Sequence, residues 1–358
     1  MRIALLGLAG SGKTTVFNAV ATTPAATPPG SFQTETHVQV VPVRDERLER
    51  CREIFQPRKY TPAGLELHDP PGLPEGGTEG DKERRARLLA SARENDAYVL
   101  VVRGFTSPQY AYERAEADPK ADLERLVGEM VSADYVICEG RAQKLRENIQ
   151  RKARSMDQDK LELAVLERCL ERLDAGKDLL DLELDDADDK RLRGFQLFSR
   201  KPRILLLNGP GDLPADLGEG LPLSFAGRLA MDAQIDAELA SMDPADRPAF
   251  MEEFGIQEAA ADRFVNEVYR GVGLLSFFTV GEDEVRAWTI HRGDSAVIAA
   301  GRIHTDLAKG FVRAEVFPFE TLDAAGGMRE LKAQNAIRLE PKDYVVKDGD
   351  IVHIRSAL

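Results

Sequence analysis

The sequence predicts an α/β fold, in which a doubly wound sheet is interrupted by a helical arm and followed by a small α+β domain. Three observations carry this prediction. The chain begins with an apolar run that breaks into glycines, the later runs Tyr98–Val102 and Ile204–Leu207 are apolar throughout, and about a hundred residues of helical pattern separate these two. Continuous apolar runs are typical of parallel strands that are covered on both faces. Such strands alternating with helices indicate a doubly wound sheet.

The first expected unit is a strand, a glycine-rich turn and a helix. Residues Ile3 to Leu6 form a short apolar run, and Gly7, Gly10 and Gly12 follow it. Apolar residues then recur at helical spacing in residues 14–21. Two further strands are expected in this part of the chain, at Val38–Val43 and Leu65–His68.

The arm is expected in residues 116–197. Apolar residues recur there at helical spacing, and there is no proline between Pro119 and Pro202, so we expect two long antiparallel helices forming a coiled coil. Basic residues gather near the expected tip, at Arg141, Lys144, Arg146, Arg151, Lys152 and Arg154. Such a charge run is either a solvated helix face or a contact for an anionic partner, and the sequence leaves both open.

Short β-rich runs separated by turn residues follow from Leu274 onward and predict a small α+β domain. The expected domains are therefore an α/β domain made of residues 1–115 and 198–274, the arm of residues 116–197, and a last domain of residues 275–358.

The composition limits the partners. Of the 358 residues, 48 are Lys or Arg and 61 are Asp or Glu, which gives a net charge of −13. A field of this sign repels nucleic acid and anionic lipid, so neither sequence-specific DNA binding nor membrane attachment is expected. No apolar run approaches the ~18 residues of a membrane span. Three cysteines, far apart in sequence, fit a reducing compartment, and a cytoplasmic location is expected.

One motif predicts phosphate binding. The segment Gly7-Leu-Ala-Gly-Ser-Gly12-Lys13-Thr14 fits the pattern G-x-x-x-x-G-K-[ST] in full, between a predicted strand and a predicted helix. Its glycines let backbone N–H groups curl around a phosphate, which the positive end of the helix also attracts. Lys13 would reach the β- and γ-phosphates, and the Thr14 hydroxyl would bind Mg²⁺.

Three further positions fit a nucleotide-dependent switch. Asp69-Pro-Pro-Gly72 follows a predicted strand and matches the pattern D-x-x-G, in which the acid holds Mg²⁺ and the glycine N–H senses the γ-phosphate; the same tetrapeptide is also an ordinary turn. Thr34 lies where a switch threonine would complete the Mg²⁺ coordination. Asn208 follows a strand, where it could contact the base or form a turn.

Several longer stretches point to a known family. They are Phe277–Thr289, Ala299–Asp306, Lys309–Val316 and Lys342–Asp350. Through them and the phosphate loop, the chain resembles the YchF/Obg-like ATPase family of translation-factor-class P-loop NTPases over essentially its whole length. The resemblance implies a G domain interrupted by a coiled-coil arm, followed by a β-grasp domain of the TGS type. It also implies hydrolysis of ATP, or of GTP in some members, and association with ribosomes.

The resemblance also assigns site residues. It implies that the residues wrapping the phosphates are Gly10, Ser11, Gly12, Lys13, Thr14 and Thr15. Thr14 and Thr34 would bind Mg²⁺, while Lys13, Asp69 and Gly72 would take part in catalysis. Asn208 falls on the asparagine of the base-reading motif Asn-x-x-Glu, and Ser224-Phe-Ala226 resembles the last nucleotide-contact loop.

The chain departs from the family pattern in three places. Gly10 replaces the family's loop asparagine, and Gly211 stands where the base-reading acid would be, with Asp212 one place later. Leu73 follows Gly72, as in the family. The family often has a histidine in the loop after the strand Tyr98–Val102, but this chain has no histidine between His68 and His291. We therefore expect slow hydrolysis and a modest preference for ATP over GTP.

The sequence thus predicts a Mg²⁺-dependent nucleotide switch that is associated with ribosomes. The alternative is a non-enzymatic ribosome-binding factor that holds the nucleotide as a regulatory ligand. A small-molecule kinase with the same loop is disfavoured, because the chain also carries the Asp69–Gly72 segment and an appended β-grasp domain.

Overall fold

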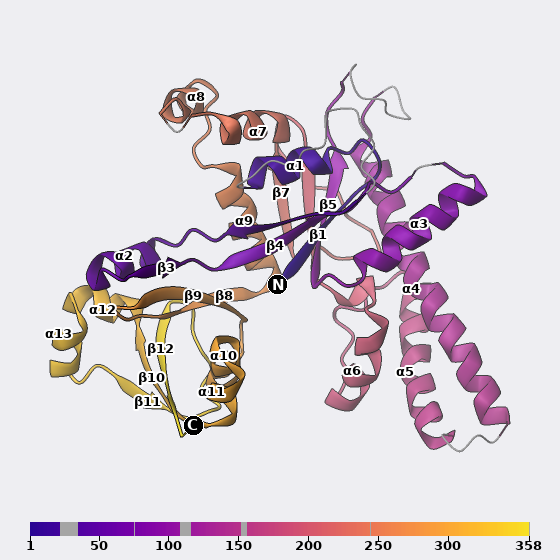
Figure 1. Ribbon diagram of the computed structural model, residues 1–358. Helices are drawn as coiled ribbons and strands as arrows, with labels where there is room; N and C mark the ends of the chain where they lie inside the picture. Colours follow the sequence, from indigo (N-terminus) through magenta and orange to yellow (C-terminus); the bar gives the residue numbers. More distant parts are fainter. Residues whose placement is uncertain (22–34, 75, 108–115, 152–155, 244, 358) are drawn as a thin grey trace. The chain divides into compact units, whose positions relative to one another are not determined.

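The computed structural model describes residues 1–21, 35–74, 76–107, 116–151, 156–243 and 245–357 (Figure 1). The chain forms two compact units. The first contains Met1–Gln39 and Glu66–Gly271, and the second contains Val40–Leu65 and Val272–Leu358. Each unit is built around its own six-stranded sheet.

The first sheet has the strand order β2-β4-β1-β5-β6-β7. Its strands are β1 (Arg2–Leu6), β2 (His37–Pro42), β4 (Gly64–Asp69), β5 (Ala97–Arg103), β6 (Arg203–Asn208) and β7 (Gly227–Met231). The neighbours from β4 to β7 pair in parallel, and β5 and β6 are buried along their whole length. The carboxyl ends of these five strands therefore meet at one edge, where ligands bind in sheets of this type. The predicted doubly wound sheet is confirmed.

Helices flank this sheet. They are α1 (Lys13–Val20), α3 (Glu79–Ala92), α7 (Ala233–Ser241), α8 (Arg247–Glu253) and α9 (Ala260–Val272). Thr78 begins α3 with a capping box, in which its side chain accepts from the Asp81 N–H and the Asp81 carboxylate accepts from the Thr78 N–H. The core on one face combines strand residues such as Tyr98, Leu100 and Val102 with Leu126 and other residues of the arm's first helix.

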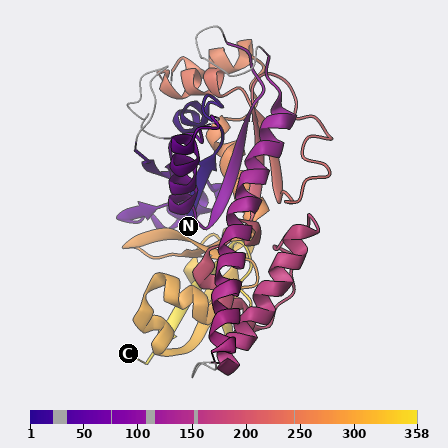
Figure 2. The ribbon, with the colours of Figure 1, turned by 90° about the vertical axis from the view of Figure 1, so that its right-hand side faces the viewer.

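The predicted arm is present as a pair of antiparallel helices, α4 (Pro119–Gln150) and α5 (Met156–Asp174), which lie side by side in both views (Figures 1 and 2). A short helix, α6 (Asp186–Leu192), and two 3₁₀ turns, Arg193–Phe195 and Phe198–Arg200, lead back to the sheet. The seam of the hairpin is apolar and buried, and it includes Cys138, Ala142, Leu145, Val165, Leu166, Cys169 and Leu170. This seam accounts for the helical periodicity of the sequence.

Three of the six basic residues expected at the tip of the arm pair with glutamates of the arm itself. Arg141 bonds Glu162 at 2.7 Å, and Arg146 contacts Glu139 and Glu167 at 3.2 and 3.1 Å. Arg151 pairs with Glu147 at 3.7 Å, while Lys152 and Arg154 lie outside the described residues. These pairs favour the solvated helix face over an anion-binding surface.

The second sheet has the order β11-β10-β12-β8-β9-β3. Its strands are β3 (Lys59–Thr61), β8 (Leu274–Thr279), β9 (Glu284–His291), β10 (Phe311–Pro318), β11 (Arg338–Glu340) and β12 (Asp350–Ser356). Two antiparallel pairs, β8 with β9 and β10 with β12, meet through a parallel pairing of β12 with β8. The helices of this unit are α2 (Glu46–Phe55), α10 (Ala296–Ile303), α11 (Thr305–Lys309), α12 (Phe319–Ala325) and α13 (Met328–Ala333). The expected small α+β domain is thus a mixed sheet with helices.

Residues 40–65 belong to this second unit, although their place in the sequence predicts that they belong to the first domain. Strand β3 pairs in parallel with β9, and the Thr61 hydroxyl bonds the Glu284 carboxylate at 2.7 Å. Arg47 on α2 lies over the Phe278 ring at 5.4 Å and bonds Asp348 at 2.8 Å. A three-residue strand whose partner lies in the last part of the chain leaves no local pattern, which is why the sequence did not reveal it.

Hydropathy along the helices gives no sign of a membrane segment: within the described ranges, none of them combines the length and the apolar character that a span requires.

Candidate nucleotide-binding site

The phosphate-loop segment leaves β1 at the carboxyl edge of the first sheet and enters α1. The first residues of this segment form backbone hydrogen bonds with Leu73, in the segment that follows β4. The Ala9 N–H donates to the Leu73 carbonyl at 2.9 Å, and the Leu73 N–H donates to the Gly7 carbonyl at 3.0 Å. The structure thereby brings together Gly7–Thr14 and Asp69–Gly72, as the two motifs require.

Glycine is needed at two positions of this site. Gly12 has φ +84°, and a Cβ atom there would lie 2.1 Å from the Asn208 amide nitrogen. A Cβ atom at Gly72 would lie 2.8 Å from the Cα atom of Ala9 and 3.2 Å from the Lys13 ammonium. The distances of 2.1 and 2.8 Å are too short for a Cβ atom, so glycine allows close approach of the chain at both positions.

Lys13, Thr14 and Asp69 form the charged centre of the site. The Thr14 hydroxyl donates to the Asp69 carboxylate at 2.7 Å, and Asp69 is fully buried. Lys13 is 6 % exposed, and its burial lowers the pKa of the ammonium, which the nearby Asp69 carboxylate raises in part. His37, at the start of β2, places Nδ1 3.8 Å from the same carboxylate. Thr34, the other predicted metal ligand, lies outside the described residues.

Asn208 ties three segments together. From the end of β6, its side-chain N–H donates to the Ser11 carbonyl at 3.0 Å, and its side-chain oxygen accepts from the Ala233 N–H at 3.2 Å. Asn208 is buried, with 4 % of its surface exposed. It therefore braces the phosphate loop against the N-terminus of α7. Thr15 follows Thr14 in the first turn of α1.

Comparison with known proteins gives a consistent result. The chain is 32 % identical to "Ribosome-binding ATPase YchF" of Bacillus subtilis and 33 % identical to the protein of the same name from Escherichia coli O157:H7. The alignments cover 98 % of this chain, and 98 % and 97 % of the two relatives. The chain belongs to the YchF family.

Family models and a solved structure agree with this assignment. The model YchF-GTPase_C, described as "Protein of unknown function (DUF933)", matches residues 274–357, and the model described as "50S ribosome-binding GTPase" matches residues 2–138. The solved structure of the Schizosaccharomyces pombe YchF GTPase superimposes with a TM-score of 0.79 at 25 % identity, covering 99 % of this chain and 97 % of that one. The YchF fold thus extends through both units.

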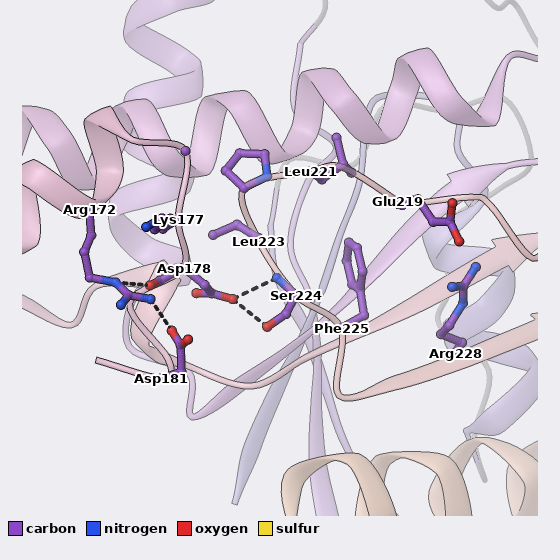
Figure 3. A pocket seen from close by; sticks show the side chains of 13 residues that line it. Arg172, Lys177, Asp178, Asp181, Glu219, Leu221, Leu223, Ser224, Phe225 and Arg228 are labelled. Atoms are coloured by element: carbon purple, nitrogen blue, oxygen red, sulfur yellow. Dashed lines mark hydrogen bonds and ion pairs between the residues drawn. The ribbon is translucent and has the colours of Figure 1, made fainter. Parts of the chain in front are cut away.

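One predicted part of the site is wrong for this YchF-family chain. Ser224 and Ala226 precede β7, and Gly227 at its start pairs with Ile204 at the start of β6. They therefore lie at the amino edge of the parallel sheet, opposite the phosphate loop. The Ser224 N–H and hydroxyl donate to the Asp178 carboxylate at 2.8 and 2.6 Å, and these bonds are visible in Figure 3. Ser224 anchors the segment after α5 and is no nucleotide contact.

The segment at the carboxyl end of β7, and not Ser224–Ala226, lies at the same edge of the sheet as the phosphate loop. It runs from Met231 to Ala233, and the Asp232 side chain caps α7 by accepting from the N–H groups of Gln234 and Ile235. The sequence signal for this segment is Asp232, an aspartate that directly precedes the helical pattern of α7. Its position after a strand is a second signal, but a weaker one. The strand itself, Gly-Arg-Leu-Ala-Met, carries an exposed arginine and no continuous apolar run.

Proposed function

We propose that this chain is a nucleotide-dependent switch that binds and slowly hydrolyses ATP, or GTP, with Mg²⁺, in association with the ribosome. The observation that carries the proposal is the meeting of Lys13, Thr14 and Asp69 at the carboxyl edge of the sheet. Its YchF relatives carry the name ribosome-binding ATPase. On the same grounds, we assign the last domain to the TGS type of β-grasp domain.

The residues present fit a magnesium ion. The Thr14 hydroxyl and the Asp69 carboxylate are oxygen ligands 2.7 Å apart, of the kind that Mg²⁺ prefers, and Thr34 would add a third. When bound, the ion would neutralise charge on the β- and γ-phosphates.

The chain's own groups would hold the phosphates. Residues Gly10 to Thr15 would wrap the phosphates at the positive end of α1. Their backbone N–H groups would donate to phosphate oxygens, except that of Ser11, which donates to the Leu8 carbonyl at 3.2 Å. Lys13 would supply a buried positive charge, which acts more strongly here than in water. Asn208 would contact the base from the end of β6. Gly72 would place its N–H at the γ-phosphate, so that loss of this phosphate releases the segment after β4.

Slow hydrolysis follows from what surrounds the γ-phosphate position. Leu73 is 2 % exposed and belongs to the hydrophobic core, so its side chain does not orient an attacking water. With charge stabilisation from Lys13, Mg²⁺ and the loop alone, we expect a basal rate of ~10⁻⁴ to 10⁻² s⁻¹, as in unstimulated switch NTPases. A single-turnover assay tests this activity. Phosphate release no faster than in buffer would instead favour a regulatory factor that binds nucleotide without hydrolysing it.

A modest preference for ATP is also proposed. A base-reading acid would accept the guanine N1–H and N2–H groups, but Gly211 has no side chain and, among the described residues, nothing lies within 4 Å of the place its Cβ would take. Losing such a paired acceptor costs about 1–3 kcal/mol of guanine recognition. Calorimetric titration of ATP against GTP tests this preference. A dissociation constant for GTP tenfold below that for ATP would show that Asp212 takes over the role.

A further inference from the structure

Arg103, the last residue of β5, is buried next to the phosphate loop with 2 % of its surface exposed. Its Nε donates to the Phe105 carbonyl and a terminal guanidinium nitrogen donates to the Gly10 carbonyl, both at 3.0 Å. The Phe105 ring lies against the guanidinium, 4.3 Å from Cζ to the ring centre. Because a guanidinium stays charged, its burial is costly unless its donors are used. The Gly10 carbonyl is therefore one of the groups that hold the Arg103 side chain in a single orientation.

The peptide bond between Gly10 and Ser11 is held at both ends. Its carbonyl accepts from Arg103, and the Ser11 N–H donates to the Leu8 carbonyl at 3.2 Å. The carbonyl and N–H of a planar trans peptide point in opposite directions, so these two bonds fix its rotation. Gly10 has φ +79° and no side chain of its own to restrain it. Since glycine loses the most backbone freedom on ordering, this outside bond restrains the loop in addition to the bond that the Asn208 side chain donates to the Ser11 carbonyl.

We propose that Arg103 is a positioning residue for nucleotide binding, which holds the Gly10–Ser11 peptide so that the following N–H groups converge on the phosphates. The proposal rests on the proposed function of the same site and adds a residue that lies outside the phosphate-loop motif. A loop that is ordered before the ligand arrives loses less entropy on binding. Arg103 therefore raises affinity for any nucleotide with a β-phosphate, whichever base it carries.

Arg203 offers a matched control in the same sheet. It is the first residue of β6, is fully buried, and donates to the carbonyls of Phe198 and Ser224 at 2.9 and 3.1 Å. It also pairs with Asp178. Its place is the amino edge of the sheet, away from the phosphate loop. A methionine there removes a buried arginine with backbone partners, just as at Arg103, without touching the loop.

The test compares Arg103→Met, Arg103→Lys and Arg203→Met in the full chain. Dissociation constants for ADP and for the non-hydrolysable analogue AMPPNP, each with Mg²⁺, are measured by calorimetry, together with melting temperatures. Guanine nucleotides replace them if the wild type prefers GTP. We expect Arg103→Met to raise the dissociation constants of both nucleotides by ~10- to 100-fold, because a hydrogen bond from a charged donor is lost. Arg103→Lys keeps the charge and one donor, so an intermediate affinity is expected. Arg203→Met should lower the melting temperature and leave both constants unchanged within about twofold.

Three outcomes would overturn the proposal: wild-type affinity in Arg103→Met, an equal loss of affinity in Arg203→Met, or a loss confined to AMPPNP, which would indicate contact with the γ-phosphate. If Arg103→Met does not fold, Arg103→Lys decides: weaker binding at an unchanged melting temperature supports the positioning role, and wild-type binding contradicts it. A wild-type chain that binds neither nucleotide would remove the proposed function and, with it, this proposal.

Discussion

At the scale of single residues, the site depends on charges that folding places out of water. Lys13 is the clearest example, because burial lowers the pKa of its ammonium while a buried carboxylate, Asp69, favours the charged form. A buried ammonium of this kind fits the role in phosphate binding that we propose for Lys13.

We therefore expect Lys13→Ala to abolish tight nucleotide binding and to leave the fold intact. The ammonium would serve the phosphates as a point charge and is not part of the hydrophobic core. Titration with ATP and GTP measures the first effect, and thermal unfolding measures the second. An unchanged affinity would remove the phosphate-loop assignment.

Asp236 on α7 provides a second test at this scale. Burial raises the pKa of its carboxyl to about 6 from the usual 3.8, although Arg263 opposes the shift from 3.5 Å. The folded chain then binds this proton more tightly than the unfolded chain does. The contribution of Asp236 to stability is therefore lost as the pH rises from about 4 to about 6, by up to about 3 kcal/mol.

The Asp236→Asn variant lacks this titration. Urea unfolding at several pH values should show the wild-type free energy of unfolding, relative to that of the variant, falling between pH 4 and pH 7. A difference that stays constant over this range would mean that Asp236 titrates normally in the folded chain.

At the scale of elements, one carboxylate fastens the arm to the sheet. Asp134 on α4 is fully buried and accepts four hydrogen bonds: from Arg93 at 2.6 Å, from the Phe198 N–H at 3.1 Å, and from the Ser199 N–H and hydroxyl at 2.8 and 2.6 Å. It thus joins α3, α4 and the turn that leads into β6. A buried charge with this many partners is costly to disrupt.

Asp134→Asn should lower the free energy of unfolding by about 3–5 kcal/mol, because it leaves the Arg93 guanidinium buried without its counter-charge. Glu162→Gln is the control. It breaks the pair with Arg141 on the surface of the arm, where Arg141 is 39 % exposed, and should cost less than about 1 kcal/mol. Equal losses in the two variants would show that Asp134 does not fasten the arm.

Elements with a strong local pattern could be predicted from the sequence. The apolar runs at Tyr98–Val102 and Ile204–Leu207 lie within β5 and β6, and the proline-free helical stretch is the α4–α5 hairpin. The sequence does not reveal strand β7, because Gly-Arg-Leu-Ala-Met is neither continuously apolar nor alternating. Without that strand, nothing in the sequence shows that Ser224 lies at the amino edge of the sheet. The Arg103 contact with Gly10 joins residues 93 apart, so no motif contains it.

At the scale of the whole molecule, the chain passes between its two units three times, after Gln39, after Leu65 and after Gly271. The second unit is therefore made of two separate segments. Within it, Leu48 and Cys51 of α2 are fully buried, and β3 covers the edge of β9. The predicted domain of residues 275–358 does not include α2 and β3, which belong to the second unit.

A fragment of residues 272–358 should consequently be less stable than the same fragment joined by a flexible linker to residues 40–65. The added segment supplies β3 and buries the apolar side chains of α2, each worth about 1.5–3 kcal/mol. Melting temperatures of the two fragments test this, with Leu48→Asp in the fused fragment as the control that should remove the gain. Equal melting temperatures would mean that residues 272–358 form the whole folding unit.

The long separation of β3 and β9 along the sequence also has a consequence during translation. Thr61 and its partner Glu284 are 223 residues apart, so residues 40–65 are made long before the strands they complete. At ~5–20 residues per second, this interval lasts roughly 10 to 45 s. Throughout it, the residues of β3 lack their partner β9, and Leu48 and Cys51 lack the packing that buries them in the second unit. Unpaired strand edges and exposed apolar side chains promote aggregation. A nascent-chain binding factor should therefore protect this chain most while residues 66–291 are being translated.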